Sequence, residues 1–164
     1  MYETGPFGFV PYDHVRERLE PSFDRISRAY GELFSGYAVK AEDVLNETIR
    51  VTHYTGWVTV DKISFYTFCE HHFLPFFGEA SVSYRPGEII TGIGKIARLV
   101  RDVHARRLQI QEIMARDICE DIIRVLGARG AHVVLRARHL CMCSRGPGDD
   151  NAETEVTYSM GEGR

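Results

Sequence analysis

Hydrophobic and polar positions along this chain change their period several times, and each change predicts the boundary of an element. Apolar residues recur at helical spacing from Phe23 to Leu33, where Ser22 can cap a helix and Ser35-Gly36 can end it. A second short helix is expected over residues 40–46. Before them lies a Gly- and Pro-rich segment, and we expect residues 1–21 to form an N-terminal arm.

The middle of the chain has the pattern of two strands followed by a pair of helices. Residues 57–68 are rich in β-branched and aromatic side chains, which favour strands. Residues 77–85 alternate apolar and polar positions, as a half-buried strand does. Helical spacing then returns over residues 96–103 and again over residues 110–126.

The last part of the chain alternates again and carries candidate chemistry. Apolar positions recur at every second residue from Val133, and the alternation continues through His139 to Cys141. If this stretch is one strand, His139 and Cys141 lie on the same face. A strand-like stretch over residues 155–158 follows. The order of the elements predicts the α+β class in a single domain over residues 1–164, with an acidic tail at residues 146–164.

Composition excludes several classes of protein. The chain has 164 residues, of which 44% are hydrophobic and 26% charged, as in an ordinary globular protein. A net charge of −3 argues against a general nucleic-acid binder or an anionic-membrane binder. No apolar run approaches the roughly 20 residues that span a bilayer, and no secretory signal is visible at the N-terminus. We therefore expect a cytoplasmic protein with no membrane and no nucleic acid among its partners.

The tetrad Cys69-Glu70-His71-His72 is the strongest chemical signal. If the backbone turns tightly there, Cys69 and His72 can bind one metal ion and leave His71 free for proton transfer. Cys141 would be a third ligand, with Cys143 as its rival, and three protein ligands leave a position open, as in catalytic Zn²⁺ sites. The alternative is a buried thiol beside two surface imidazoles. Cys119, within an apolar-periodic segment, is expected to be a core residue.

Two further segments suggest ligand binding. The glycines of Gly92-Ile93-Gly94 precede a predicted helix that carries Lys95 and Arg98 on one face, which suits an anion, although a solvated basic face would look the same. Glu112 begins the next predicted helix beside Gln111. A carboxylate can accept two parallel N–H donors, as guanine offers and adenine does not, but an exposed helix start is the alternative.

In combination, these motifs resemble the GTP cyclohydrolase I family, and the resemblance covers about three quarters of the chain. The matching segments are CEHHFLPFFG at 69–78, GIGKIAR at 92–98, RRLQIQE at 106–112, HLCMCSRG at 139–146, and, upstream, RISRAY at 25–30 and FSGY at 34–37.

The resemblance implies a tunnelling fold, in which an antiparallel sheet carries a helix pair on one side and several subunits assemble into a barrel. It implies a homodecamer of two pentamers with active sites between subunits. It further implies the conversion of GTP and water to 7,8-dihydroneopterin triphosphate and formate, the first step of pterin and folate-type biosynthesis.

Residue by residue, the resemblance assigns these roles: zinc ligands Cys69, His72 and Cys141; catalytic imidazoles His71 and His139; substrate binding by Glu112, which holds the guanine ring, and by Gln111 beside it; and triphosphate contacts Lys95, Arg98, Arg145, Arg25 and Arg28.

The chain departs from the family pattern near the expected triphosphate site. Gly94 stands where the family usually has Ser, Arg28 where many members have Lys, and Glu155 where a Thr is usual. These departures suit a divergent GTP cyclohydrolase or a paralogue that acts on another purine nucleotide in a specialised pathway. Two further hypotheses are nitrile-reductase chemistry on the same fold and a non-catalytic, zinc-stabilised interaction module.

Overall fold

The C-terminal part of the chain is built on a five-stranded sheet with the strand order β5-β2-β3-β6-β7. The computed structural model describes residues 10 and 12–163, and the chain divides after Leu33 into two compact units. The strands are β2 (Val58–Cys69), β3 (Pro75–Arg85), β5 (Leu108–Gln109), β6 (Gly130–His139) and β7 (Thr154–Gly161). All neighbours in the sheet are antiparallel except β5, which is parallel to β2.

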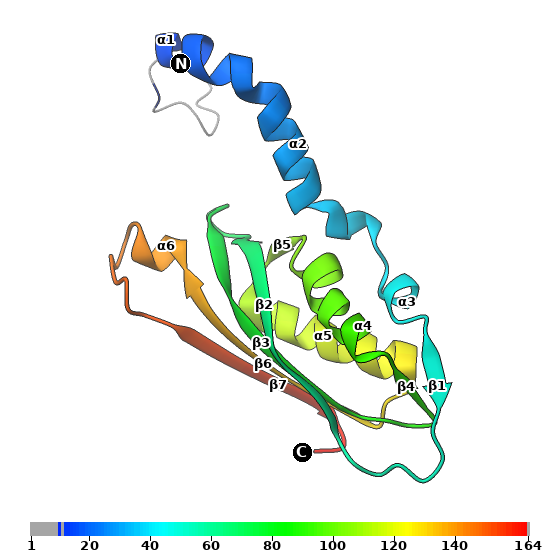
Figure 1. The fold of residues 1–164 in the computed structure, drawn as a ribbon. Coiled ribbons are helices and arrows are strands. Elements are labelled where there is room, and N and C mark those ends of the chain that lie inside the picture. The colour runs from blue at the N-terminus through cyan, green and yellow to red at the C-terminus, as the bar shows by residue number, and fades with distance from the viewer. Residues whose placement is uncertain (1–9, 11, 164) are drawn as a thin grey trace. The chain divides into compact units, whose positions relative to one another are not determined.

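Helices cover one face of this sheet (Figure 1). They are α4 (Ile93–Arg98), which continues into the π-helical segment η4 (Leu99–His104), and α5 (Gln111–Leu126). Short elements complete the unit: η3 (Ser35–Ala38), α3 (Ala41–Val44), the two-stranded sheet β1 (Thr48–Arg50) with β4 (Ile89–Thr91), and α6 (Leu140–Cys143). The predicted α+β class and the helix pair are therefore confirmed.

The core explains this arrangement. Buried positions alternate along β2 at Ile63, Phe65, Thr67 and Cys69, so every second side chain faces the helices. β6 follows the same period, and α5 buries most of the apolar stripe that predicted it, although Ile113 is exposed; the predicted burial of Cys119 is confirmed. β2 and β6 end at the same end of the sheet, because each pairs antiparallel with β3, which lies between them. Cys69 and His139 therefore lie at the edge of the core.

The first unit is helical over its described residues, through α1 (Tyr12–His14), η1 (Val15–Leu19), η2 (Glu20–Ser22) and α2 (Phe23–Leu33). The helix predicted from Phe23 to Leu33 is confirmed as α2, but Ser22 is not its N-cap, because the helical turn η2 leads directly into it. Pro21 does not interrupt the helical turns, since it occupies the first positions of the 3₁₀ turn, where its missing N–H costs nothing. The arm predicted over residues 1–21 is thus helical from Tyr12, and its residues 1–9 and 11 lie outside the described part.

Several predicted boundaries shift by a few residues. The strand predicted over residues 77–85 begins at Pro75, and its Ser83 is buried because its hydroxyl shares a hydrogen bond of 2.9 Å with that of Thr59. The final strand runs over residues 154–161 and is a full edge strand of the sheet. In the part of the chain that the structure describes, no helix is both long enough and apolar enough to cross a membrane.

Candidate active site

A tight turn between β2 and β3 forms the first half of the site. Cys69 ends β2, and its backbone N–H and C=O bond to Leu74 and Phe73 at 2.8 Å each. Phe73 closes the turn with a left-handed backbone, at φ 54°. The turn brings Nδ1 of His72 to 3.8 Å and Nδ1 of His71 to 3.9 Å from the Cys69 sulfur. The tight turn that the tetrad required is therefore present.

The second half of the site differs from the sequence prediction. β6 ends at His139, and Cys141 lies in the helical turn α6 rather than on the strand. The strand prediction for residues 140–141 was wrong because residues 140–144 close a turn, in which the Ser144 N–H and hydroxyl both donate to the Leu140 carbonyl. Cys141 and Cys143 therefore do not share a strand face, since positions two apart on a helix point in different directions.

Cys69, His72 and Cys141 form a group that could hold a metal ion. Their ligand atoms all lie within 4.8 Å of one another, and Cys143 is not part of the group. Tetrahedral zinc with thiolate and imidazole ligands separates sulfur from nitrogen by about 3.6 Å, close to the 3.8 Å between Cys69 and His72. The donor set of two sulfurs and one nitrogen suits zinc and leaves one position open.

The charge balance of the two thiols also fits a cation. Burial raises the pKa of the Cys141 thiol, and the neighbouring Cys69 sulfur raises it further. A metal ion between the sulfurs would reverse both effects, because it binds and stabilises the thiolate form.

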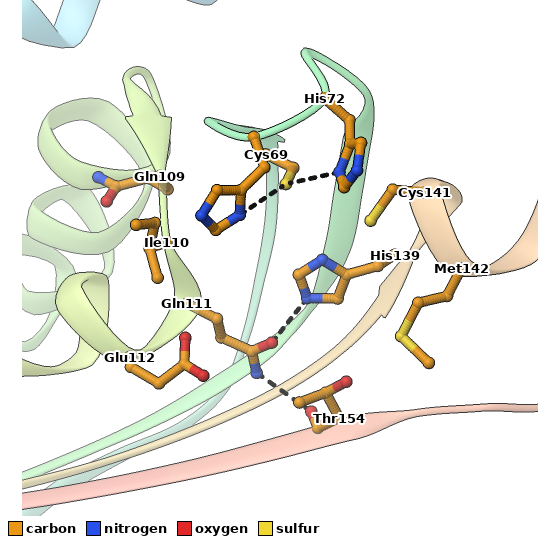
Figure 2. Close-up of a pocket in the computed structure, with 11 residues that line it drawn as sticks. Cys69, His72, Gln109, Ile110, Gln111, Glu112, His139, Cys141, Met142 and Thr154 are labelled. Carbon is orange, nitrogen blue, oxygen red and sulfur yellow. Dashed lines mark hydrogen bonds between the residues drawn. The ribbon is translucent and has the colours of Figure 1, made fainter. Parts of the chain in front are cut away.

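His139 is the last residue of β6 and lies beside this group, with its ring turned toward the start of α5 (Figure 2). Its ring stacks on Phe76, its cross-strand neighbour, with centroids 4.2 Å apart and planes within 7° of parallel. Phe76 is fully buried, so one face of the imidazole is fixed by the core. Burial lowers the pKa of His139, and the charge of Glu112 opposes this effect. Burial therefore disfavours the charged imidazolium form of His139.

An open cavity of about 220 Å³ joins these groups. Its lining includes the three candidate metal ligands and also His71, His139, Gln111 and Glu112. Four lining residues were not predicted: Gln109, Ile110, Met142 and Thr154. Gln109 and Ile110 precede α5 within the family-like RRLQIQE segment, and Met142 lies between the two cysteines of α6, so both segments pointed to them. Thr154 lies in the acidic region, and it reaches the cavity only through the pairing of β7 with β6.

Gln111 and Glu112 start α5 but differ in environment. Gln111 is 3% exposed, and its side chain bonds to His139 and to two backbone carbonyls. Glu112 is exposed and borders the cavity. The structure therefore brings Glu112 together with the metal group and both histidines.

Two of the cations predicted to bind phosphate, Lys95 and Arg98, lie away from the metal group in the same unit. Lys95 and Arg98 line a second cavity with Glu47, Gly92 and Gly94, and the two cavities share no lining residue. The Lys95 ammonium is 3.0 Å from the Glu47 carboxylate. α4 begins next to β4, whereas the metal group lies where β2 and β6 end, at the other end of the sheet (Figure 1).

The remaining predicted cations are exposed. Arg145 follows α6, close enough for its charge to lower the pKa of Cys141 against the effect of burial. Arg25 and Arg28 lie on α2 of the first unit, exposed and three residues apart.

The acidic residues near the C-terminus have local partners. Glu155 bonds to Arg136 at 2.6 Å across the strand pair, and the Asp149 carboxylate accepts the N–H groups of Asn151 and Ala152. Neither cavity is lined by an acid from residues 149–155.

Comparison with known proteins decides the family. The sequence model of the GTP cyclohydrolase I family matches residues 8–164. The chain belongs to the GTP cyclohydrolase I family. This confirms the resemblance drawn from the motifs, and with it the expectation of an enzyme.

Named relatives agree with this assignment. GTP cyclohydrolase 1 of Allorhizobium ampelinum is 44% identical over 151 residues, which cover 92% of this chain and 75% of that protein. GTP cyclohydrolase 1 2 of Pseudomonas syringae pv. tomato is 40% identical over 161 residues, which cover 98% and 88% of the two chains.

A solved structure supports the fold. The archaeosine synthase QueF-Like, in its apo form, superimposes with a TM-score of 0.52 at 18% identity and covers 68% of this chain and 99% of that one. At this identity the likeness concerns the fold alone, which is that of a tunnelling-fold protein.

Proposed function

We propose that this GTP cyclohydrolase I family member is a zinc-dependent enzyme that converts GTP and water to 7,8-dihydroneopterin triphosphate and formate. The observation that supports it most is the meeting of three groups at one cavity: the metal-binding set of Cys69, His72 and Cys141, the imidazole of His139, and the carboxylate of Glu112. A structural metal would require only the first of these. The reaction would be the first step of pterin and folate-type biosynthesis.

Cys69, His72 and Cys141 would hold the zinc ion. Bound there, zinc would supply Lewis-acid activation of water at neutral pH. His71 lies 3.9 Å from the Cys69 sulfur, with its ring on the same cavity, and is placed to move a proton. The balance of the reaction requires several proton transfers, because two hydrolyses add two waters and closure of the pterin ring releases one.

Glu112 would orient the purine. Its carboxylate can accept both the N1–H and the exocyclic amine of guanine, a parallel pair of donors that adenine lacks. His139 would then face the imidazole part of the purine, where C8 is attacked and N7 gains a proton. An imidazole suits this role, because it can accept and return a proton within one turnover.

The triphosphate would extend beyond the cavity of the metal group. At about 220 Å³, this cavity is smaller than the roughly 300–1,000 Å³ of sites that enclose whole ligands. Lys95 and Arg98 lie at the other end of the sheet, so one copy of the unit does not bring them to the same cavity. A homo-oligomer solves this, and we propose the barrel-shaped decamer of the family, with active sites between subunits. Arg145, Arg25 and Arg28 would add phosphate contacts.

A second candidate is a cyclohydrolase for another purine nucleotide. Gly94 favours it, since it borders the cavity of Lys95 and Arg98 without the hydroxyl that family members usually place there. The metal group and both histidines would serve either substrate.

Incubation of the zinc-loaded protein with GTP, ITP or ATP tests both candidates. We expect formate and a fluorescent pterin, after oxidation, from GTP in equal amounts. Cys141→Ser should abolish both products, whereas the matched Cys143→Ser should retain them, because Cys143 lies outside the metal group. Formate from another purine and none from GTP would contradict the first candidate and support the second.

A further inference from the structure

The orientation of the Gln111 amide determines which ring nitrogen of His139 carries the proton. Gln111 is the first residue of α5 and is almost completely buried, at 3% exposure. Its Nε2 lies 2.9 Å from the carbonyl oxygen of Leu135 and 3.1 Å from that of Thr154. Carbonyl oxygens only accept hydrogen bonds, so the amide nitrogen must face them.

The amide oxygen of Gln111 therefore faces His139. Oε1 lies 2.7 Å from Nε2 of His139, as Figure 2 shows. An amide oxygen has no hydrogen to donate, so Nε2 of the imidazole must carry the proton. In a neutral imidazole the other nitrogen, Nδ1, then keeps a free lone pair.

The rest of the site holds the ring in this orientation. Phe76 packs flat against one face of the imidazole, which limits rotation about the side chain. In Figure 2 the ring nitrogen that does not meet Gln111 lies on the side turned toward Cys69 and Cys141. Two hydrogen bonds from the Gln111 amide, to the carbonyls of Leu135 in β6 and Thr154 in β7, join the first turn of α5 to the sheet.

We propose that Gln111 is a positioning residue that holds neutral His139 as the Nε2–H tautomer, so that Nδ1 is the ring atom presented to the substrate. Gln111 then acts through His139 and does not touch the purine itself, in contrast to the contact that the family resemblance assigned to it. The inference rests on the proposed function only for the identity of the substrate. The tautomer follows from the hydrogen bonds alone.

Nitrogen NMR of the ring tests the tautomer directly. Zinc-loaded protein labelled with ¹⁵N in its histidine rings is measured by magic-angle spinning at pH 8.5, well above the usual histidine pKa of about 6.5. The His139 signals are identified by their loss in His139→Gln. We expect a protonated Nε2 and an unprotonated Nδ1. A protonated Nδ1 in the wild-type protein would overturn the proposal, whatever the variants do.

Two matched variants separate positioning from packing. Gln111→Met keeps the length of the side chain and removes its oxygen, so His139 should become a mixture of both tautomers. Gln109→Met removes an amide from the same segment, but that amide bonds to the His104 carbonyl, so His139 should keep Nε2–H. Equal tautomer signals in Gln111→Met and wild type would overturn the proposal.

Kinetics with GTP gives an independent readout. Gln111→Met should lower kcat by roughly 10- to 100-fold, less than the roughly 10²- to 10⁴-fold of a complete loss of acid–base catalysis because His139 itself remains, and leave KM within about twofold. A raised KM with an unchanged kcat would identify Gln111 as a substrate contact and overturn the proposal. If the wild type does not turn over GTP, the proposed function fails, while the NMR result still decides the tautomer.

Discussion

Asp121 connects α5 to His104, the last residue of η4, and its removal should measurably lower the free energy of unfolding. Its carboxylate is 3.1 Å from Nε2 of His104, whose side chain is only 2% exposed, and it also bonds to Arg124. His104 Nδ1 is buried with no hydrogen-bond partner among the described residues. In Asp121→Ala, both ring nitrogens of His104 would be buried without a partner.

The size of the effect follows from these contacts. Loss of a hydrogen bond to a charged group, with its partner left buried, costs about 2–4 kcal/mol. The exposed pair with Arg124 adds little. For a chain of this length, the loss corresponds to a drop in Tm of roughly 5–12 °C. The matched control is Asp117→Ala on the same helix, whose partner Arg116 is well exposed, and it should change stability by less than about 0.5 kcal/mol.

The difference in stability between Asp121→Ala and Asp117→Ala should also depend on pH. Burial alone would raise the pKa of Asp121, but the hydrogen bonds from His104 and Arg124 outweigh it and lower the pKa. A lowered carboxyl pKa stabilises the folded state above its unfolded value of about 3.9, and the stabilisation is lost as pH falls through the folded pKa. Urea unfolding at pH 7 and pH 3, at equal protein concentration, measures both effects. Equal stability losses in the two variants, or a difference that grows toward pH 3, would refute the reasoning.

Three further changes have definite expected results. Gly94→Ser should be tolerated, because no atom beyond its chain neighbours and its own helix backbone lies within 4 Å of the added Cβ, and it should lower the KM for GTP by adding a hydroxyl beside Lys95 and Arg98, the cations that we propose bind the phosphates; an unchanged KM would show that this residue does not meet the phosphates. Burial raises the pKa of Cys119 to about 12, so titration of the native protein with a thiol reagent at pH 8 should give the same count for Cys119→Ala and wild type, and denatured protein one fewer for the variant. Gly78→Ala should prevent folding, since its Cβ would lie 1.8 Å from the Arg136 carbonyl oxygen, and circular dichroism of the purified variant checks this.

The spacing of apolar residues along the chain correctly predicted the helices and strands that bury one face. The stripe of α5 and the alternation along β2 gave correct elements because burial on one face enforces their period. The same reasoning failed at Cys141, where the alternation of β6 continued in the sequence but the backbone turned into α6. There, hydrogen bonds from Ser144 to Leu140 determine the structure, and residue hydrophobicity does not record them.

The sequence predicted which residues come together as candidate metal ligands, but not the contacts around them. The spacing of Cys69 and His72 sufficed because a four-residue turn fixes their distance. That Gln111 faces His139 depends on carbonyls from two strands that are distant in sequence, and no local signal shows it. The separation of Lys95 from the metal group likewise emerges only once the sheet is assembled.

A zinc titration of the metal-free protein, with formate release from GTP as the readout, tests the central proposal most directly. We predict that activity rises linearly with added Zn²⁺ and reaches a plateau at one ion per chain. Cys143→Ser should follow the same curve, and Cys141→Ser should stay inactive at every ratio. Full activity in the metal-free protein, or an active Cys141→Ser, would contradict a catalytic zinc held by Cys69, His72 and Cys141.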